Sequence, residues 1–285
     1  MYLNHFGLIQ YPFSLTPNTR YFLKLPSHQQ AFSLLLEALD GTNSFAKITG
    51  EVGTGKTMLC RKVLNTLDSQ PSRFATAYVP HPILSEEGIM QAIAEELGMP
   101  ECASMNYYNV LKRITERLLR YSREGKSVVL LIDEAQAMPE ETLEALYLLS
   151  TLKSEATKRL QIVLFGQPEL DELLASPSLH RLNKSLSFEF LLPPLNRENT
   201  EAYVAHRLMK AGYNGPHMFS KQALNLLHQS SNGNPRIINI LAHKAMMAAY
   251  GKGDHDITDV HVSRAVADTE SAQLPVSFAS RLFAT

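Results

Sequence analysis

The residues best suited to chemistry form one glycine-rich stretch near the start of the chain. It reads Gly50-Glu51-Val52-Gly53-Thr54-Gly55-Lys56-Thr57, follows an apolar run at 45–49, and leads into a segment that can continue as a helix. This is the spacing of a P-loop. Glycines let the backbone turn tightly so that successive N–H groups point at a phosphate, and a helix N-terminus adds partial positive charge. We therefore expect these eight residues, with Met58, to bind a nucleoside triphosphate.

Two side chains of this stretch have separate expected roles. Lys56 can reach the β- and γ-phosphates, and the Thr57 hydroxyl can ligate Mg²⁺. A flexible surface loop with a stray lysine is the alternative, and the preceding strand and following helix make it the weaker one. The expected ligands are ATP and Mg²⁺.

A pair of acids follows the most apolar run of the chain. Residues 128–132 read Val-Val-Leu-Leu-Ile and end in Asp133-Glu134. A carboxylate at the carboxyl end of a buried parallel strand lies in the crevice where α/β sheets bind ligands. We expect Asp133 to hold Mg²⁺ and Glu134 to orient and deprotonate the attacking water. A base for water predicts hydrolysis rather than transfer to another substrate.

Two further residues are candidates from their positions. Gln167 follows the apolar run at 160–165, and its amide would sense the γ-phosphate and the water if that strand lies between the other two. Arg236 opens a later helix after Gly233-Asn234-Pro235 and would bind the γ-phosphate from a second domain. The alternatives are a turn glutamine and an arginine paired with a nearby acid.

Composition excludes several classes of protein. The 285 residues are 45% hydrophobic and 19% charged, with a net charge of −1, so no global field attracts DNA or anionic lipid. Cys60 and Cys102 form no ligand spacing, as expected of reduced thiols in a cytosolic protein. No apolar run approaches the length of a membrane span, and the N-terminus lacks the charged and apolar regions of a signal peptide. We therefore expect a cytoplasmic location.

The apolar pattern predicts an α/β fold followed by a helical domain. Strands at 45–49, 73–79, 128–132, 160–165 and 186–192 alternate with helices, which is typical of a parallel sheet covered on both faces. From 194 to 270 only helices are predicted. We place the nucleotide-binding domain at 1–193, the helical domain at 194–270 and a tail at 271–285. Residues 1–30 form an aromatic and proline-rich arm, predicted either to cover a core or to wall the adenine ring.

The motifs together resemble a known family. GEVGTGKT, VVLLIDEAQ, FGQPEL and GNPRIINIL, with the opening FGL…PF…P, are similar to the AAA+ ATPases of the ExeA/GspA secretion group, and within it most to the MSHA-type pilus biogenesis ATPases. The resemblance runs to about residue 270. It implies a five-stranded AAA+ core, a helical lid, ATP hydrolysis and service to a type IV pilus or type II secretion system.

The sequence departs from this family in two respects. ExeA itself is a longer protein with a membrane span and a periplasmic part, and this sequence contains neither. The family also has an arginine in a Gln-Arg-Ile triplet before the fifth strand. In the family, this arginine of one subunit binds the γ-phosphate in the site of the neighbouring subunit. Here that position is Ser185, within Lys184-Ser185-Leu186. Arg181 or Lys184 can substitute, although neither inherits the role by alignment.

We therefore expect a cytoplasmic AAA+ ATPase that can associate peripherally with the inner membrane, forms a homo-oligomer with ATP and acts on pilus or secretion proteins by moving its lid. One alternative is an adaptor that binds ATP, hydrolyses it weakly and switches partners. The other is a DNA-associated transposition-helper ATPase, which would need a local basic face.

Overall fold

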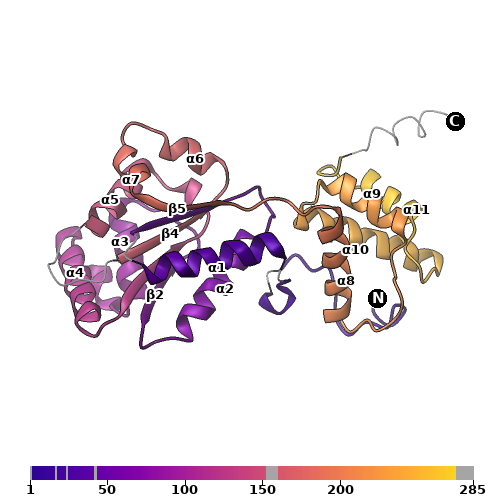
Figure 1. Cartoon of the computed structure of the whole chain (residues 1–285), viewed down its shortest axis with the longest axis horizontal. Helices are drawn as coiled ribbons and strands as arrows, with labels where there is room; N and C mark the ends of the chain where they lie inside the picture. The colour runs from indigo at the N-terminus through magenta and orange to yellow at the C-terminus, as the bar shows by residue number, and fades with distance from the viewer. Residues whose placement is uncertain (1, 17, 24, 42–43, 152–159, 274–285) are drawn as a thin grey trace. The chain divides into compact units, whose positions relative to one another are not determined.

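The structure is a computed structural model of the chain and describes residues 2–16, 18–23, 25–41, 44–151 and 160–273. It divides into two compact units (Figure 1). One unit, which we call the nucleotide-binding unit after its predicted role, consists of residues 26–51 and 56–192, and the helical unit contains residues 1–25, 52–55 and those from 193 onward.

The nucleotide-binding unit is built on a five-stranded parallel sheet in the order β2-β3-β4-β1-β5. The central strands β3 and β4 are buried along their whole length, whereas in β5 at the edge half-buried and exposed residues alternate. This is the pattern expected when both faces of a parallel sheet are covered and one edge is open. The strands are β1 Phe45–Thr49, β2 Phe74–Val79, β3 Ser127–Ile132, β4 Leu160–Gly166 and β5 Leu186–Leu191.

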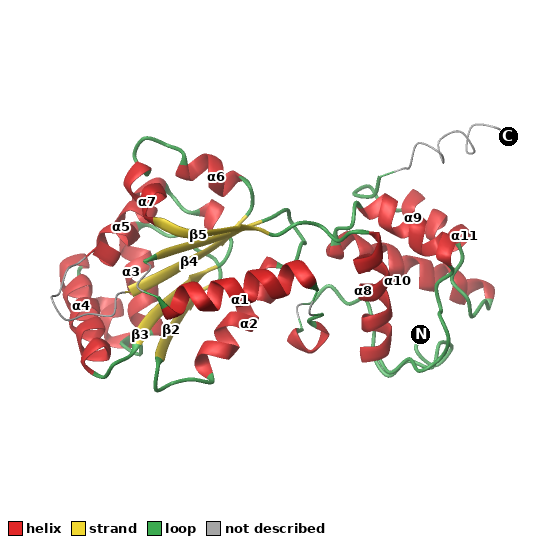
Figure 2. Ribbon diagram, in the orientation of Figure 1, coloured by secondary structure: helices red, strands yellow, loops and turns green. Residues whose placement is uncertain are grey.

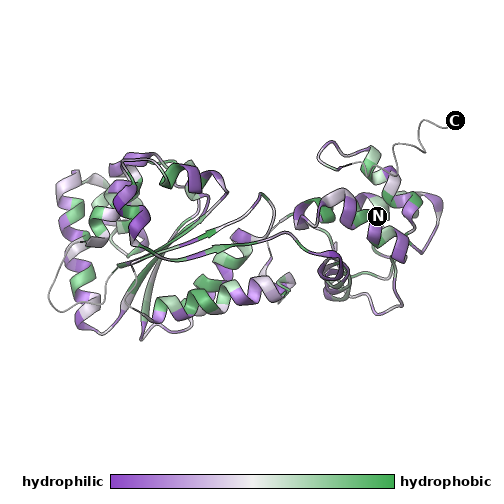
Figure 3. Cartoon of the chain, turned by 45° about the horizontal axis from the view of Figure 1, so that its top comes forward, coloured by the Kyte–Doolittle hydropathy of each residue, from purple (hydrophilic) through white to green (hydrophobic). Residues whose placement is uncertain are grey.

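Helices cover both faces of this sheet. Helices α1 and α2 pack together on one face, and α3, α4 and α5 pack on the other (Figures 1 and 2). Figure 3 shows that green, hydrophobic residues concentrate in the strands of this sheet. The helices are α1 Pro26–Asp40, α2 Lys56–Asp68, α3 Glu86–Glu96, η2 Pro100–Ser104, α4 Tyr107–Arg123, η3 Ala135–Ala137, α5 Glu140–Thr151, α6 Glu169–Leu174 and α7 His180–Ser185.

The helical unit has its own core, formed by buried aliphatic residues of four longer helices. Its longest helix is α10, whose start is specified locally: the Asn234 side chain accepts the N–H groups of Arg236 and Ile237, and Pro235 occupies the first turn. The helices are η1 Thr19–Tyr21, α8 Arg197–Lys210, α9 Lys221–Ser231, α10 Pro235–Lys252 and α11 Asp259–Ala267.

The N-terminal arm packs in the helical unit. Tyr2, Phe6, Leu8 and Phe13 are buried in the same core as α8 to α11. From the sequence this arm is predicted to belong to the domain at 1–193. The packing corresponds to the core-covering alternative for these residues, and the adenine-wall alternative stays a prediction.

The main elements were predicted within a few residues of their bounds. The five predicted strands each agree with the structure to within one residue at either end: for example, the strand predicted at 73–79 begins at Phe74, and the strand predicted at 186–192 ends at Leu191. The short helices α6 and α7 were not predicted. Within the described residues no helix is long and apolar enough to cross a membrane. Of the predicted tail, residues 274–285 lie outside the described part.

Candidate active site

The P-loop connects the buried strand β1 to the first turn of α2. Its second and third glycines, Gly53 and Gly55, have φ angles of 85° and 103°, a region that side chains other than glycine rarely adopt. Helix α2 begins at Lys56 and carries no acidic residue in its first turn. The helix terminus therefore presents N–H groups and partial positive charge without a competing carboxylate.

Lys56 lies against the backbone of the loop. Its side chain is 5% exposed, and Nζ donates hydrogen bonds to the carbonyl oxygens of Gly50 at 2.6 Å and Glu51 at 2.9 Å. Burial lowers the pKa of Lys56, while the nearby carboxylates of Glu134 and Asp133 act in the opposite direction. A buried ammonium group beside phosphate-binding backbone is suited to an anionic ligand.

Asp133 follows β3 and is only 3% exposed. The Thr57 hydroxyl donates a hydrogen bond to its carboxylate, and the backbone N–H of Glu134 donates another to Oδ1 at 3.1 Å. Burial raises the pKa of Asp133, and these two hydrogen bonds oppose the rise. The hydroxyl and carboxylate oxygens are the hard donors that Mg²⁺ prefers, and their direct contact shows that this pair fits such an ion.

Glu134 has an unusual backbone conformation and a constrained side chain. Its φ and ψ angles are 54° and 38°, in the left-handed region. Its Oε2 accepts hydrogen bonds from the side-chain amides of Gln136 at 2.7 Å and Gln167 at 3.2 Å. Burial raises the pKa of Glu134, but the two amides and the charge of Lys56 outweigh it, so that the pKa lies below its usual value. Glu134 is therefore ionised at neutral pH.

Gln167 lies immediately after β4, which runs between β3 and β1. The order that the sequence analysis required for a γ-phosphate sensor is therefore present. An amide nitrogen carries two hydrogens, and the bond to Glu134 uses one of them. The other is available for a second acceptor.

Gln136 was not identified from the sequence, although it lies in the quoted motif VVLLIDEAQ. It is in the short helix η3, and its amide contacts both Glu134 and the backbone N–H of Gln167. The signal that would have identified it is the position of a long amide side chain two residues after an expected catalytic acid. The structure thus brings together Lys56, Thr57, Asp133, Glu134 and Gln167, with Gln136 added.

The other predicted cations are exposed on helices. Arg236 is in the first turn of α10 in the helical unit, and it lies beside the P-loop residue Gly53 of the same unit, because a Cβ added to Gly53 would be 2.5 Å from the Arg236 Cβ. Arg181 and Lys184 are exposed on α7, while Ser185 ends that helix with its hydroxyl donating to the carbonyl of Leu182 at 2.6 Å. The predicted roles of these residues therefore stay proposals.

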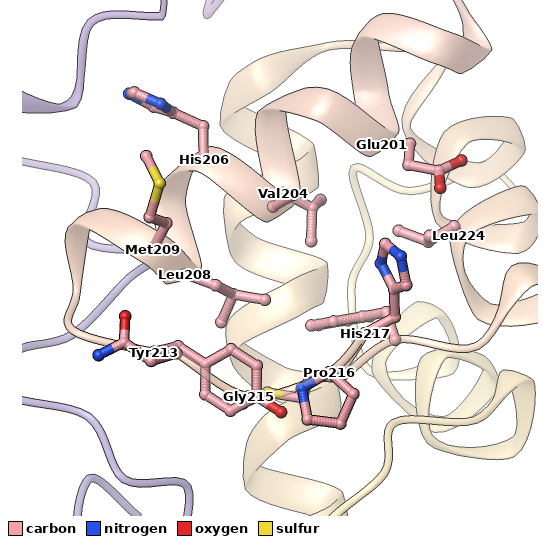
Figure 4. A pocket seen from close by; sticks show the side chains of 14 residues that line it. Glu201, Val204, His206, Leu208, Met209, Tyr213, Gly215, Pro216, His217 and Leu224 are labelled. Atoms are coloured by element: carbon pink, nitrogen blue, oxygen red, sulfur yellow. The ribbon is translucent and has the colours of Figure 1, made fainter.

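A pocket in the helical unit is separate from the predicted site residues. It has a volume of about 560 Å³ and lies between α8 and the loop that leads to α9 (Figure 4). Val204, Leu208 and Tyr213 contribute to its mainly apolar lining. None of the residues assigned above to phosphate, Mg²⁺ or water lines it.

The sheet order, the P-loop after β1 and the acidic pair after β3 define the AAA P-loop fold. Residues 39–174 match an AAA domain family. Among solved structures, the ORC2 protein of Aeropyrum pernix in its ADPNP–ADP complexes has a TM-score of 0.69 at 17% identity, covering 97% of this chain and 74% of that one. Cdc6p of Pyrobaculum aerophilum also has a TM-score of 0.69, at 18% identity, covering 90% and 70%. At these identities the likeness establishes the fold alone.

A relative with a higher sequence identity was found among curated proteins. General secretion pathway protein A of Aeromonas hydrophila is 37% identical over 265 residues, which are 93% of this chain and 48% of that protein. The chain thus spans about half the length of the relative it matches. This chain therefore has the AAA P-loop fold and is similar to a secretion-pathway protein.

Proposed function

We propose that this protein binds ATP with Mg²⁺ and hydrolyses it to ADP and phosphate. The observation that carries the proposal is the convergence of a P-loop lysine, a hydroxyl–carboxylate pair and an ionised glutamate at the carboxyl ends of neighbouring parallel strands. This combination supplies groups for phosphate, metal and water in one crevice.

The residues of the P-loop bind and orient the triphosphate. The backbone N–H groups of residues 50–58 surround the phosphates, and the Lys56 ammonium exchanges its carbonyl partners for phosphate oxygens. Thr57 and Asp133 hold Mg²⁺, which when bound neutralises charge that develops on the phosphate oxygens.

Glu134 and Gln167 act on the water. The ionised carboxylate of Glu134 accepts a proton from the water, and Gln167 orients Glu134 while its second N–H donates to the γ-phosphate. Arg236 contributes a cation from the helical unit and couples the nucleotide state to that unit.

The biological role proposed here is in envelope assembly. Similarity to a general secretion pathway protein supports service to a type II secretion system or an MSHA-like type IV pilus. In this proposal the protein acts at the cytoplasmic side of the inner membrane as a homo-oligomer, and ATP-driven movement of the helical unit acts on an assembly protein.

The test of nucleotide binding compares two lysines of the same helix. Lys56→Ala should abolish binding of a fluorescent ATP analogue and hydrolysis, because its ammonium is at the phosphate site. Lys62→Ala, about 1.7 turns further along α2, should retain both. Equal affinity of Lys56→Ala and the parent for the analogue would refute the proposal.

A second candidate is an adaptor that binds ATP but turns it over weakly. It is favoured by Ser185, whose hydroxyl bonds back to Leu182 at the position where the family has an arginine. A ring that uses Arg181 or Lys184 from a neighbouring subunit should show rising turnover per subunit as protein concentration increases. An adaptor should show low turnover that does not depend on concentration.

A further inference from the structure

The Gln136 side chain connects the two strand ends that carry Glu134 and Gln167. Its Nε2 donates to Glu134 Oε2 at 2.7 Å, and its Oε1 accepts the backbone N–H of Gln167 at 3.0 Å. Residue 134 follows β3 and residue 167 follows β4, which are neighbouring strands. One amide therefore links the expected base to the segment that bears the expected sensor.

The orientation of this amide is fixed by its two partners. A backbone N–H can only donate, so the oxygen of the Gln136 amide must face Gln167. An ionised carboxylate can only accept, so the nitrogen must face Glu134. A glutamate at position 136 would place two carboxylates together, and a methionine would supply neither bond. The site therefore requires both ends of a glutamine amide.

The neighbouring backbone leaves room for this link. A Cβ added to Gly166 would lie 3.3 Å from Gln136 Oε1 and 2.7 Å from a methyl group of Leu170. The absence of a side chain at the last residue of β4 thus permits the close approach of the amide to Gln167.

The two bonds to Glu134 leave its carboxylate asymmetric. Both amides donate to Oε2, and no described residue donates to Oε1. Oε1 therefore keeps its lone pairs for a water molecule, while Oε2 fixes the direction of the group.

We propose that Gln136 is a positioning residue for hydrolysis, which holds Oε2 of Glu134 and the backbone of Gln167 so that Oε1 of Glu134 is directed at the water. This inference rests on the proposed ATP hydrolysis. The amide of Gln136 contacts Glu134 and the backbone of Gln167, so its effect should be on turnover and not on nucleotide affinity.

The experiment measures kcat, KM for ATP and melting temperature for three variants. Gln136→Met should lower kcat by about tenfold or more, with KM and the affinity for a non-hydrolysable ATP analogue within about twofold of the parent. Gln136→Glu keeps the acceptor for Gln167 but loses the donor, so it should not restore kcat. Gln136→Asn is too short and should not restore it either.

A matched control separates positioning from stability. Gln161 is a buried glutamine of the same unit, at the other end of β4, whereas Gln136 is half-buried; the amide of Gln161 donates to the carbonyl of Leu39 at 3.1 Å. Gln161→Met should lower the melting temperature at least as much as Gln136→Met, with parental kcat. If both variants lost kcat in proportion to stability, Gln136 would have a structural role only.

A double-mutant cycle tests whether Gln136 acts through Glu134. In the Glu134→Gln background, Gln136→Met should cause little further loss of kcat, because the group that it positions is already inactive. An equal further loss, or parental kcat in Gln136→Met alone, would overturn the inference.

An NMR measurement distinguishes failure of the inference from failure of the proposed function. In nucleotide-free protein, the side-chain amide of Gln136 should give a downfield-shifted proton that moves back in Glu134→Ala. If the parent showed this resonance but bound ATP without hydrolysing it, the proposed function would fail while the contact stood. If the parent hydrolysed ATP but the resonance did not respond to Glu134→Ala, the inference alone would fail.

Discussion

Each unit contains a polar cluster, and the two clusters are satisfied to different extents. In the helical unit, Arg207 is 7% exposed, and its Nε, Nη1 and Nη2 donate to the carbonyl of Pro12, the hydroxyl of Tyr203 and the carbonyl of Ser14. In the nucleotide-binding unit, Glu134 is half-buried and accepts two hydrogen bonds on one oxygen, with none from the described residues on the other.

This is the difference that we expect between a cluster that stabilises the fold and a cluster that takes part in catalysis. Arg207 also lies over the ring of Tyr21, at 4.8 Å from its centre, so its bonds attach the N-terminal arm to α8. Its charged group faces neutral acceptors, and all three of its nitrogens donate a hydrogen bond that holds the fold. The Glu134 cluster retains bonding capacity at strand ends where ligands bind. Substitutions in the first should lower stability, and substitutions in the second should lower turnover.

The largest effect is expected at Arg207. Arg207→Met should destabilise the helical unit by about 3 kcal/mol, because it leaves the carbonyls of Pro12 and Ser14 without a donor. A urea titration followed by circular dichroism measures this. Arg197→Met is the control on the same helix, since its half-exposed ion pair with Glu201 should contribute about 1 kcal/mol or less. Equal losses in the two variants would break the comparison.

Substitution of Gln167 should lower turnover and leave stability nearly unchanged, the opposite of what is expected at Arg207. Gln167→Leu removes a donor to Glu134 and, in our proposal, to the γ-phosphate, so kcat should fall about 100-fold, with little change in melting temperature. Steady-state phosphate release measures the effect. Gln222→Leu, at an exposed position of α9, should behave as the parent in both measurements. A Gln167→Leu variant with parental kcat would remove this residue from the active cluster.

Gly233 should show a purely structural effect before α10. Its φ is 70°, and an added Cβ would lie 1.9 Å from the carbonyl oxygen of Leu195. Gly233→Ala should therefore cost about 2 kcal/mol of unfolding free energy. Gly251→Ala lies within α10 and has open space around it, so it should instead stabilise the protein by about 0.5–1 kcal/mol. Similar urea midpoints for the two variants would contradict this reading of the turn.

The smallest effect on stability is expected at Lys47, which forms a third polar cluster with two carboxylates. This cluster tests whether burial of a charged side chain is enough to make it important for stability. Its Nζ contacts Asp171 at 2.6 Å and Glu189 at 2.8 Å, and the side chain is 8% exposed. Both carboxylates are about half exposed, so Lys47→Met leaves no buried charge and should change stability by about 1 kcal/mol or less. Thermal unfolding measures it. A loss as large as that of Arg207→Met would show that burial, and not satisfaction of carbonyl groups, governs these clusters.

Much of the nucleotide-binding unit was predictable from local patterns. The apolar run before Asp133 and the glycines before Lys56 have short-range physical causes, and the structure places strands and a helix where these residues required them. The position of β4 between β3 and β1 needed a three-dimensional assumption, which the sheet order now supplies.

The side-chain contacts were not predictable in the same way. The role of Gln136 depends on the left-handed backbone at Glu134 and on the absence of a side chain at Gly166, neither of which appears in a pattern of apolar residues. The packing of the arm was not predictable either, since burial of Tyr2 and Phe6 against α8 to α11 is a long-range contact. Sequence patterns identify elements, whereas such contacts depend on how the elements pack.

The central claim is that Glu134 is the base for hydrolysis within a site that binds nucleotide without it. The most direct measurement is of ATP binding and single-turnover hydrolysis on the same sample of Glu134→Gln. Our account predicts parental affinity with hydrolysis slowed by about 100-fold or more, since the amide keeps the size of the side chain but cannot accept the proton. Hydrolysis at the parental rate would contradict it.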